Sequence, residues 1–142
     1  MSPLRTDYRL LVAVIAPLLL WQWVPRWDES IFSAGWGGAV MFCVAIAVLE
    51  EVIFRGGLQG WLLRRETMQH RAAGLSRANW ITSSLFAFAH LWMHPAWLMP
   101  GYLGVSLVLG YFRERYQGIL IPVLLHAWYN LALLLLPVLL GS

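Results

Sequence analysis

Five ionisable side chains lie inside apolar stretches of the sequence, and their chemistry needs an explanation. They are Glu50, Glu51, Arg55, His90 and His126. An Asp, Lys or Arg at the centre of a membrane helix costs about 2.5–3.5 kcal/mol on insertion scales, so ionisable groups in such positions are usually functional. A carboxylate beside a histidine can take a proton from water, which is the first step of general-base hydrolysis.

Three of these side chains lie at a similar distance from arginines at the ends of the apolar stretches. Glu50 is 14 residues from the nearest such arginine, His90 is 13 and His126 is 11. At a helical rise of about 1.5 Å per residue, these separations are about 17–21 Å. In a hydrocarbon core about 30 Å thick, all three side chains would lie near the middle. The spacing therefore predicts one site built from three helices.

Glu51 and Arg55 are four residues apart and share a helix face. They can form an ion pair, which lowers the cost of burying both charges. Glu50 is rotated by about 100° from Glu51, so it can face a different cavity and act as a general base. We expect Glu51 and Arg55 to support the site.

Other polar and aromatic residues accompany the two histidines. Asn130 follows His126 by four residues, so both side chains can donate hydrogen bonds to a developing oxyanion. Asn130 alone would indicate a hydrogen bond between helices. Phe86 precedes His90 by one turn and can buttress its ring.

The composition indicates which elements position these residues. Sixty per cent of the 142 residues are apolar and 12% are charged, which is too few for the surface of a water-soluble domain. A spanning helix needs roughly 20 mostly apolar residues, so the chain has room for about five. We predict an all-α fold, a polytopic transmembrane helix bundle of about five spans with the active site inside the membrane, as a single domain over residues 1–142.

The predicted spans cover residues 10–24, 31–63, 80–92, 97–112 and 119–140. The second is too long for one straight span, so we expect a kink, tilt or interfacial continuation near Gly56 and Gly57. The loop of residues 64–77 contains four arginines and is expected to form a short amphipathic helix on the membrane surface. The lone Cys43 lies in an apolar stretch, which predicts a packing role.

The chain has ten arginines and no lysine, and all of the arginines except Arg55 lie between or beside the apolar stretches. This pattern is typical of membrane orientation signals and not of nucleic-acid binding. With the N-terminus in the cytoplasm, eight arginines lie inside and only Arg26 lies outside. The sequence therefore predicts a cytoplasmic N-terminus, an outer C-terminus, contact with the lipid bilayer and no nucleic-acid partner.

Three short motifs occur in order on separate apolar stretches. Residues 50–55 fit EExxxR, residues 86–90 fit FxxxH and residues 126–130 fit HxxxN. Together they resemble the CAAX-protease and bacteriocin-processing (CPBP) family, also called Abi or type II CAAX proteases. The resemblance covers about residues 45–135 and implies a glutamic-type intramembrane protease in a bacterial or archaeal inner (cell) membrane.

The resemblance also implies roles for the residues. Glu50 and His90 would activate water, and His126 and Asn130 would stabilise the oxyanion. The substrate would be a membrane-anchored protein or peptide, and no cofactor would be needed. Better-known members have about eight spans, so this chain is more similar to small members that process C-terminal sorting signals, such as the JDVT-CTERM type.

Other chemistry is compatible with the same residues. Glu50, His90 and His126 could bind zinc with one position open for water, although the sequence has no HExxH motif. A serine intramembrane protease would need a nucleophile, and Ser106 with His126 gives only a partial match to the rhomboid pattern. In a different class, His90 and His126 could be axial ligands of a haem, or the polar cluster could serve only packing in a scaffold or immunity protein.

Overall fold

The computed structural model describes residues 7–20 and 29–140. These residues are almost entirely helical, which confirms the predicted all-α class, and a single two-stranded hairpin is found among them. They divide into two compact units. One unit is Ala47–His126, and the other comprises the described residues up to Ile46 and from Ala127 onward. The single domain over residues 1–142 stays a prediction.

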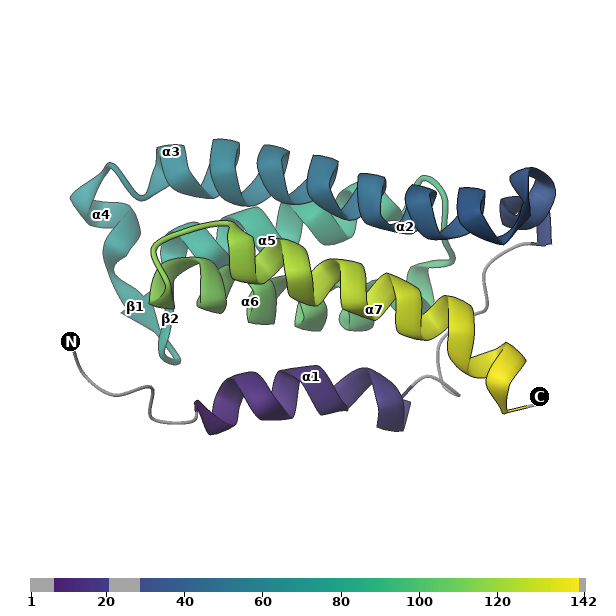
Figure 1. Cartoon of the computed structure of the whole chain (residues 1–142). Coiled ribbons are helices and arrows are strands. Elements are labelled where there is room, and N and C mark those ends of the chain that lie inside the picture. The colour runs from purple at the N-terminus through teal and green to yellow at the C-terminus, as the bar shows by residue number, and fades with distance from the viewer. Residues whose placement is uncertain (1–6, 21–28, 141–142) are drawn as a thin grey trace. The chain divides into compact units, whose positions relative to one another are not determined.

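In the unit that contains the ends of the chain, the elements among the described residues are all helical. They are α1 (Tyr8–Leu20), the 3₁₀ helix η2 (Glu29–Ala34), α2 (Gly35–Glu51) up to Ile46, and α7 (Leu120–Leu139) from Ala127 (Figure 1). The predicted first span is helical to Leu20, and residues 21–24 lie outside the described residues. Arg26, which the predicted orientation places outside, also lies outside the described residues.

Two small side chains and a leucine form the core where α2 meets α7 in this unit. Ala39 and Cys43 on α2 pack with Leu134 on α7, and all three are buried. Small residues let membrane helices approach closely, since packing is the main attraction between helices in lipid. Cys43 is a buried free thiol, in keeping with the predicted packing role.

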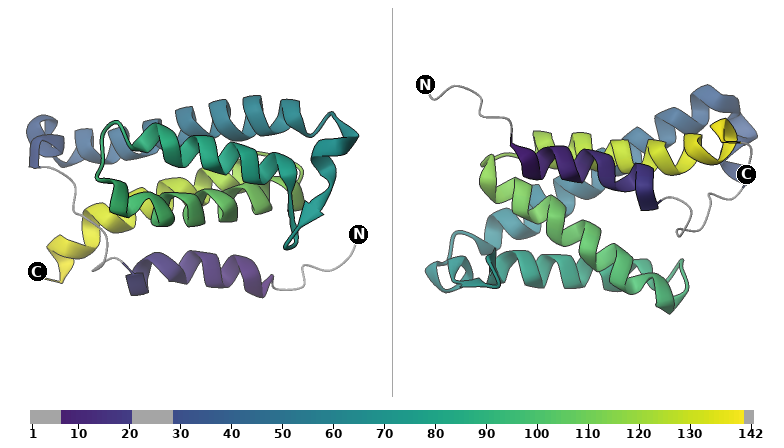
Figure 2. Two further views of the ribbon diagram at one scale, coloured as in Figure 1. Left: turned by 180° about the vertical axis from the view of Figure 1, so that it is seen from behind. Right: turned by 90° about the horizontal axis from the view of Figure 1, so that it is seen from below.

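The second unit contains two antiparallel helices and the segment that follows α2. Its elements are the π-helix η3 (Val52–Gln59), α3 (Gly60–Leu62), α4 (Glu66–Gln69), β1 (Arg71–Ala72), β2 (Leu75–Ser76), α5 (Arg77–His90), the 3₁₀ helix η4 (Ala96–Leu98) and α6 (Met99–Arg115). The unit also includes α2 from Ala47 and α7 up to His126. Helices α5 and α6 lie side by side, and η3 contacts both (Figure 2).

Two of the described helices are long and apolar enough to cross a membrane. They are the continuous helix Gly35–Leu62, with 28 residues, and Leu120–Leu139, with 20. α5 has 14 residues and α6 has 17, while Tyr8–Leu19 is a shorter apolar helix. Five helical segments thus match the five predicted spans, and the crossing of three of them stays a prediction.

The chain stays helical through Gly56 and Gly57, where we expected a kink, tilt or interfacial continuation. Residues Val52–Gln59 form a π-helix there. π-helical turns are rare and occur frequently at functional sites. This one begins directly after Glu50 and Glu51, so the two carboxylates lie where the helix changes its winding.

The amphipathic helix expected over residues 64–77 is wrong. The segment contains the single helical turn α4 and an antiparallel hairpin of β1 and β2. Ala73 and Gly74 join the strands with φ of 53° and 80°. Two-residue hairpin loops of type I′ need positive φ at both positions, which explains why the chain turns here.

Polar contacts fix α5 against α6. Ser76 caps α5 by accepting a hydrogen bond from the Asn79 backbone N–H, at 2.9 Å. The Asn79 amide donates to the Leu107 carbonyl at 3.0 Å and accepts from the Ser83 hydroxyl at 2.9 Å. A Cβ atom at Gly110 would clash with this amide, so glycine is required where the two helices meet.

Candidate active site

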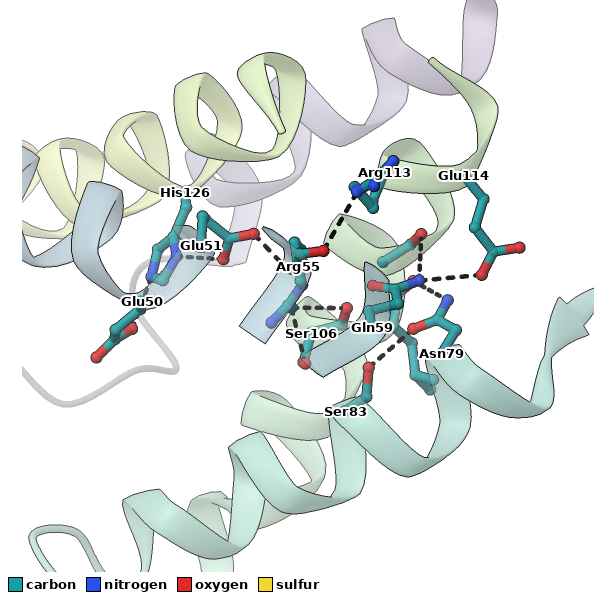
Figure 3. A network of polar contacts seen from close by, with 12 residues as sticks. Glu50, Glu51, Arg55, Gln59, Asn79, Ser83, Ser106, Arg113, Glu114 and His126 are labelled. Carbon is teal, nitrogen blue, oxygen red and sulfur yellow. Dashed lines mark hydrogen bonds and ion pairs between the residues drawn. The ribbon is translucent and has the colours of Figure 1, made fainter. Parts of the chain in front are cut away.

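Glu50 and Glu51 are the last two residues of α2, and their side chains enter different surroundings (Figure 3). The Glu51 side chain is fully buried, whereas that of Glu50 is 19% exposed. Successive residues of a helix differ in direction by about 100°, which accounts for the separation. The two neighbouring carboxylates therefore have different partners.

Glu51 and Arg55 form the ion pair that their spacing predicts. Arg55 Nε lies 3.3 Å from Glu51 Oε2, and both side chains are fully buried. Arg55 Nη2 donates to the backbone carbonyl and the hydroxyl of Ser106, at 3.0 and 2.8 Å. Its guanidinium also lies over the Phe86 ring, 5.1 Å from the centroid. The Ser106 hydroxyl is thus a buried partner of Arg55, which argues against Ser106 as the nucleophile of a serine protease.

His126 lies between the two carboxylates. Its Nδ1 is 2.8 Å from Glu51 Oε1, and its Nε2 is 3.5 Å from Glu50 Oε2. An ionised carboxylate can only accept, so Nδ1 carries a proton that it donates to Glu51. Glu51 therefore orients His126 as well as pairing with Arg55, a link that the sequence did not predict.

His90 approaches Glu50 from the end of α5. Its Nδ1 lies 2.8 Å from the Phe86 carbonyl oxygen, so Nδ1–H donates, and its Nε2 lies 4.0 Å from Glu50 Oε1. The Phe86 and His90 ring centroids are 4.4 Å apart, as expected for a buttress. In the turn after α5, partial burial and the nearby His90 lower the pKa of His94, which favours its neutral form.

Asn130 belongs to the other unit. Its Nδ2 donates to the Cys43 carbonyl oxygen at 3.2 Å, which joins α7 to α2 there. The structure brings Glu50, His90 and His126 together in one unit, and the oxyanion role of Asn130 stays a prediction.

A metal ion or a haem is an alternative occupant of this site. Among residues 7–20 and 29–140, no group of three or more His, Cys, Asp or Glu side chains is arranged to hold a metal ion. That the reaction needs no metal stays a prediction. A haem between His90 and His126 is disfavoured, because the Glu50 carboxylate lies next to Nε2 of both rings, where the porphyrin would have to be.

The structure also contains a second group of buried polar contacts that the sequence did not predict. Gln59 Nε2 donates to the Gly110 carbonyl at 3.1 Å and to Glu114 Oε1 at 3.0 Å (Figure 3). The Ser76 hydroxyl donates to the same carboxylate at 2.5 Å. Gln59 follows Arg55 by four residues, so an extension of the Glu51 and Arg55 spacing would have indicated it. The Gln59 contacts join η3 to α6, in addition to the hydrogen bonds between Arg55 and Ser106.

Comparison with known proteins gives one match. A family model described as type II CAAX prenyl endopeptidase Rce1-like matches residues 31–132, which include the whole Glu50, His90 and His126 cluster. No curated protein and no solved structure matches the chain significantly.

Proposed function

This chain belongs to the Rce1-like family of type II CAAX prenyl endopeptidases, and from that premise we propose that Glu50, His90 and His126 carry out its intramembrane proteolysis. The family makes the chain a membrane protease that acts on a peptide or protein. One observation carries the assignment of residues. The Glu50 carboxylate is flanked by two imidazole nitrogens at 3.5 and 4.0 Å, both long for a direct hydrogen bond.

Glu50 and His90 are placed to hold the attacking water. Because His90 Nδ1–H donates to the Phe86 carbonyl, a neutral ring has its lone pair on Nε2, facing Glu50. A water molecule can bridge groups that are too far apart for direct contact, here by donating one hydrogen to each. As its oxygen attacks the peptide carbonyl carbon, Glu50 takes the proton and later delivers it to the amide nitrogen when the C–N bond breaks.

His126 is placed to stabilise the negative charge that develops on the carbonyl oxygen. Its Nδ1–H is held by Glu51, so the ring orientation is fixed before the reaction. A second proton on Nε2 would make the ring a cation between the carboxylates of Glu50 and Glu51. The two positive charges of His126 and Arg55 would then balance the two negative charges of these carboxylates. Preorganised donors of this kind are often the largest single contribution to catalysis. We propose Asn130 as a second donor because of its place in the HxxxN motif.

The substrate and the orientation of the chain belong to the same proposal. The matched family is described as prenyl endopeptidases. We propose that the substrate is a membrane-anchored protein or peptide, with C-terminal sorting signals as a second substrate class to test beside prenylated peptides. We propose an inner (cell) membrane location with the N-terminus in the cytoplasm, based on the distribution of arginines.

The test uses purified protein in detergent and a panel of membrane-anchored peptides, with and without prenyl groups. Product masses would be compared for wild type, Glu50→Gln, His90→Ala and Glu66→Gln, in which the same chemical change is made at an exposed carboxylate. We expect Glu50→Gln and His90→Ala to lower turnover by about 10²–10⁴-fold, the usual contribution of general acid–base catalysis. Glu66→Gln should match wild type. Turnover at the wild-type rate in Glu50→Gln would overturn the mechanism.

A further inference from the structure

Phe86 and Tyr102 present the two nearest rings to the imidazole of His90, and the His94 ring stacks farther away, at 6.1 Å between centroids. The Phe86 ring lies 4.4 Å away between centroids, with 36° between the planes. The Tyr102 ring lies 4.3 Å away, with 28° between the planes. One face of an imidazole is too small for two such neighbours, so Phe86 and Tyr102 cover its two faces. Tyr102 belongs to none of the three sequence motifs.

The hairpin of α5 and α6 explains why Tyr102 reaches this position. His90 is the last residue of α5, and Tyr102 lies in the first turn of α6. Pro100 starts α6, because a proline in the first turn loses no helical hydrogen bond and its φ is already suitable. In an antiparallel hairpin, the end of one helix lies beside the start of the next. The short turn therefore brings Tyr102 against His90.

The ring contacts oppose rotation of the His90 imidazole. The ring is held at Nδ1 by the Phe86 carbonyl, and rotation about its bond to Cβ would swing Nε2 away from Glu50. A ring packed on both faces cannot make that rotation without displacing a neighbour. Misplacing a reacting group by about 1 Å can cost about 10²-fold in rate.

We propose that Tyr102 is a positioning residue that keeps His90 Nε2 directed at Glu50. This inference rests on the proposed function. We assign the effect to the flat ring, and Tyr102→Phe tests the hydroxyl, which has an electrostatic interaction with Glu50. Among the described residues no hydrogen-bond partner is found for the Tyr102 hydroxyl, whereas that of Tyr129 donates to the Ala13 carbonyl at 3.0 Å.

The experiment compares Tyr102→Phe, which keeps the ring, with Tyr102→Leu and Tyr102→Met, which remove it. Tyr116→Leu is the matched control, because Tyr116 directly follows the same helix and its ring lies near Phe112. For each variant, kcat and KM would be measured on a cleaved peptide, together with thermal unfolding. We expect Tyr102→Phe and Tyr116→Leu to match wild type. Tyr102→Leu and Tyr102→Met should lower kcat by about tenfold or more while KM stays nearly constant, as for a misplaced reacting group.

Several outcomes separate this inference from the proposed function. Wild-type kcat in folded Tyr102→Leu or Tyr102→Met would overturn the positioning role, provided that Glu50→Gln is inactive. A loss in Tyr102→Phe as large as that in Tyr102→Leu would overturn the assignment to the ring. Turnover in Glu50→Gln would instead overturn the proposed function. If neither Leu nor Met folds, ¹⁵N NMR of histidine-labelled Tyr102→Phe decides, because a changed His90 tautomer would contradict an effect of the ring alone.

Discussion

Glu50 and Glu51 are neighbours in the chain, yet Glu51 has short contacts and is fully buried, whereas Glu50 has long contacts and is partly exposed. The Glu51 carboxylate lies 2.8 Å from His126 Nδ1 and 3.3 Å from Arg55 Nε, with no exposed surface. The Glu50 carboxylate is 19% exposed and has its two imidazole neighbours at 3.5 and 4.0 Å. We call the first region, which comprises Glu51, Arg55, Gln59, Ser106 and Glu114, the buried network. The second, which comprises Glu50, His90 and His126, is the Glu50 cluster.

The difference shows that stability and catalysis place different requirements on polar residues. A charge that is fully buried must be paired and hydrogen-bonded, or the fold is lost. In the buried network the charges of Glu51 and Arg55 are paired, and each group also has a hydrogen bond, to His126 and to Ser106. A general base must keep bonding capacity for the water that it activates. The Glu50 cluster keeps that capacity because its contacts are long. Glu51 of the buried network bonds only Nδ1 of His126, which leaves Nε2 facing Glu50.

The largest effect on stability should come from removing the cation of the buried network. Arg55→Ala leaves Glu51 as a buried carboxylate without its guanidinium partner, which typically costs about 3–5 kcal/mol. Glu50→Gln should instead unfold close to wild type, within about 1 kcal/mol, because a partly exposed group loses little. Thermal unfolding in detergent and the yield of folded protein measure both. If Arg55→Ala melts like wild type, the two regions do not differ in the way described.

A medium effect should follow from crowding the contact between α5 and α6. Gly110→Ala places a methyl group in the space of the Asn79 amide, and overpacking of this kind costs about 1–3 kcal/mol. Gly104→Ala is the matched control in the same helix, since a Cβ atom there meets nothing within 4 Å. The shift in thermal midpoint would be measured for both. Asn79→Ala added to Gly110→Ala should recover part of the loss, and equal shifts at the two glycines would refute the close contact.

A small effect is expected where the buried network reaches the surface. Arg71 Nη2 lies 3.3 Å from Glu114 Oε2, but the Arg71 side chain is 56% exposed. Exposed ion pairs contribute about 0–1 kcal/mol and are weakened by salt, so Arg71→Ala should cost no more than that. Unfolding at low and high salt would measure it. A loss of several kcal/mol would show that the hairpin belongs to the buried network.

The sequence was sufficient to predict the helices because hydropathy is a local property. α5 begins at Arg77 where the prediction began at 80, and α7 covers Leu120–Leu139 where the prediction covered 119–140. The hairpin of β1 and β2 was missed because it depends on positive φ at Ala73 and Gly74, while the arginine content suggested only a surface segment. The division into two units has no signal in the hydropathy.

The candidate site was predictable where it depends on spacing within one helix. The Glu51 and Arg55 pair follows from four-residue spacing, and so does the contact of Phe86 with His90. The hydrogen bond from His126 to Glu51 depends on how α7 is rotated about its axis, and one sequence does not define that rotation. The catalytic roles stay predictions.

Removing metal ions should have the smallest effect of all, with no change in turnover. Nε2 of His90 and of His126 lie 4.0 and 3.5 Å from the Glu50 carboxylate, so these are the three residue types that a zinc ion would need, although the described side chains are not arranged to hold one. Glu51 and the Phe86 carbonyl hold the opposite nitrogens, as outer partners of zinc ligands often do. Because Glu50 and His90 can activate water without a Lewis acid, we expect turnover to persist after exhaustive chelation and elemental analysis to find no stoichiometric zinc. Zinc near one per chain, with turnover lost on chelation and restored by zinc, would change Glu50 from a base into a ligand. The open bonding of the Glu50 cluster would then be space for a metal rather than for a bridging water.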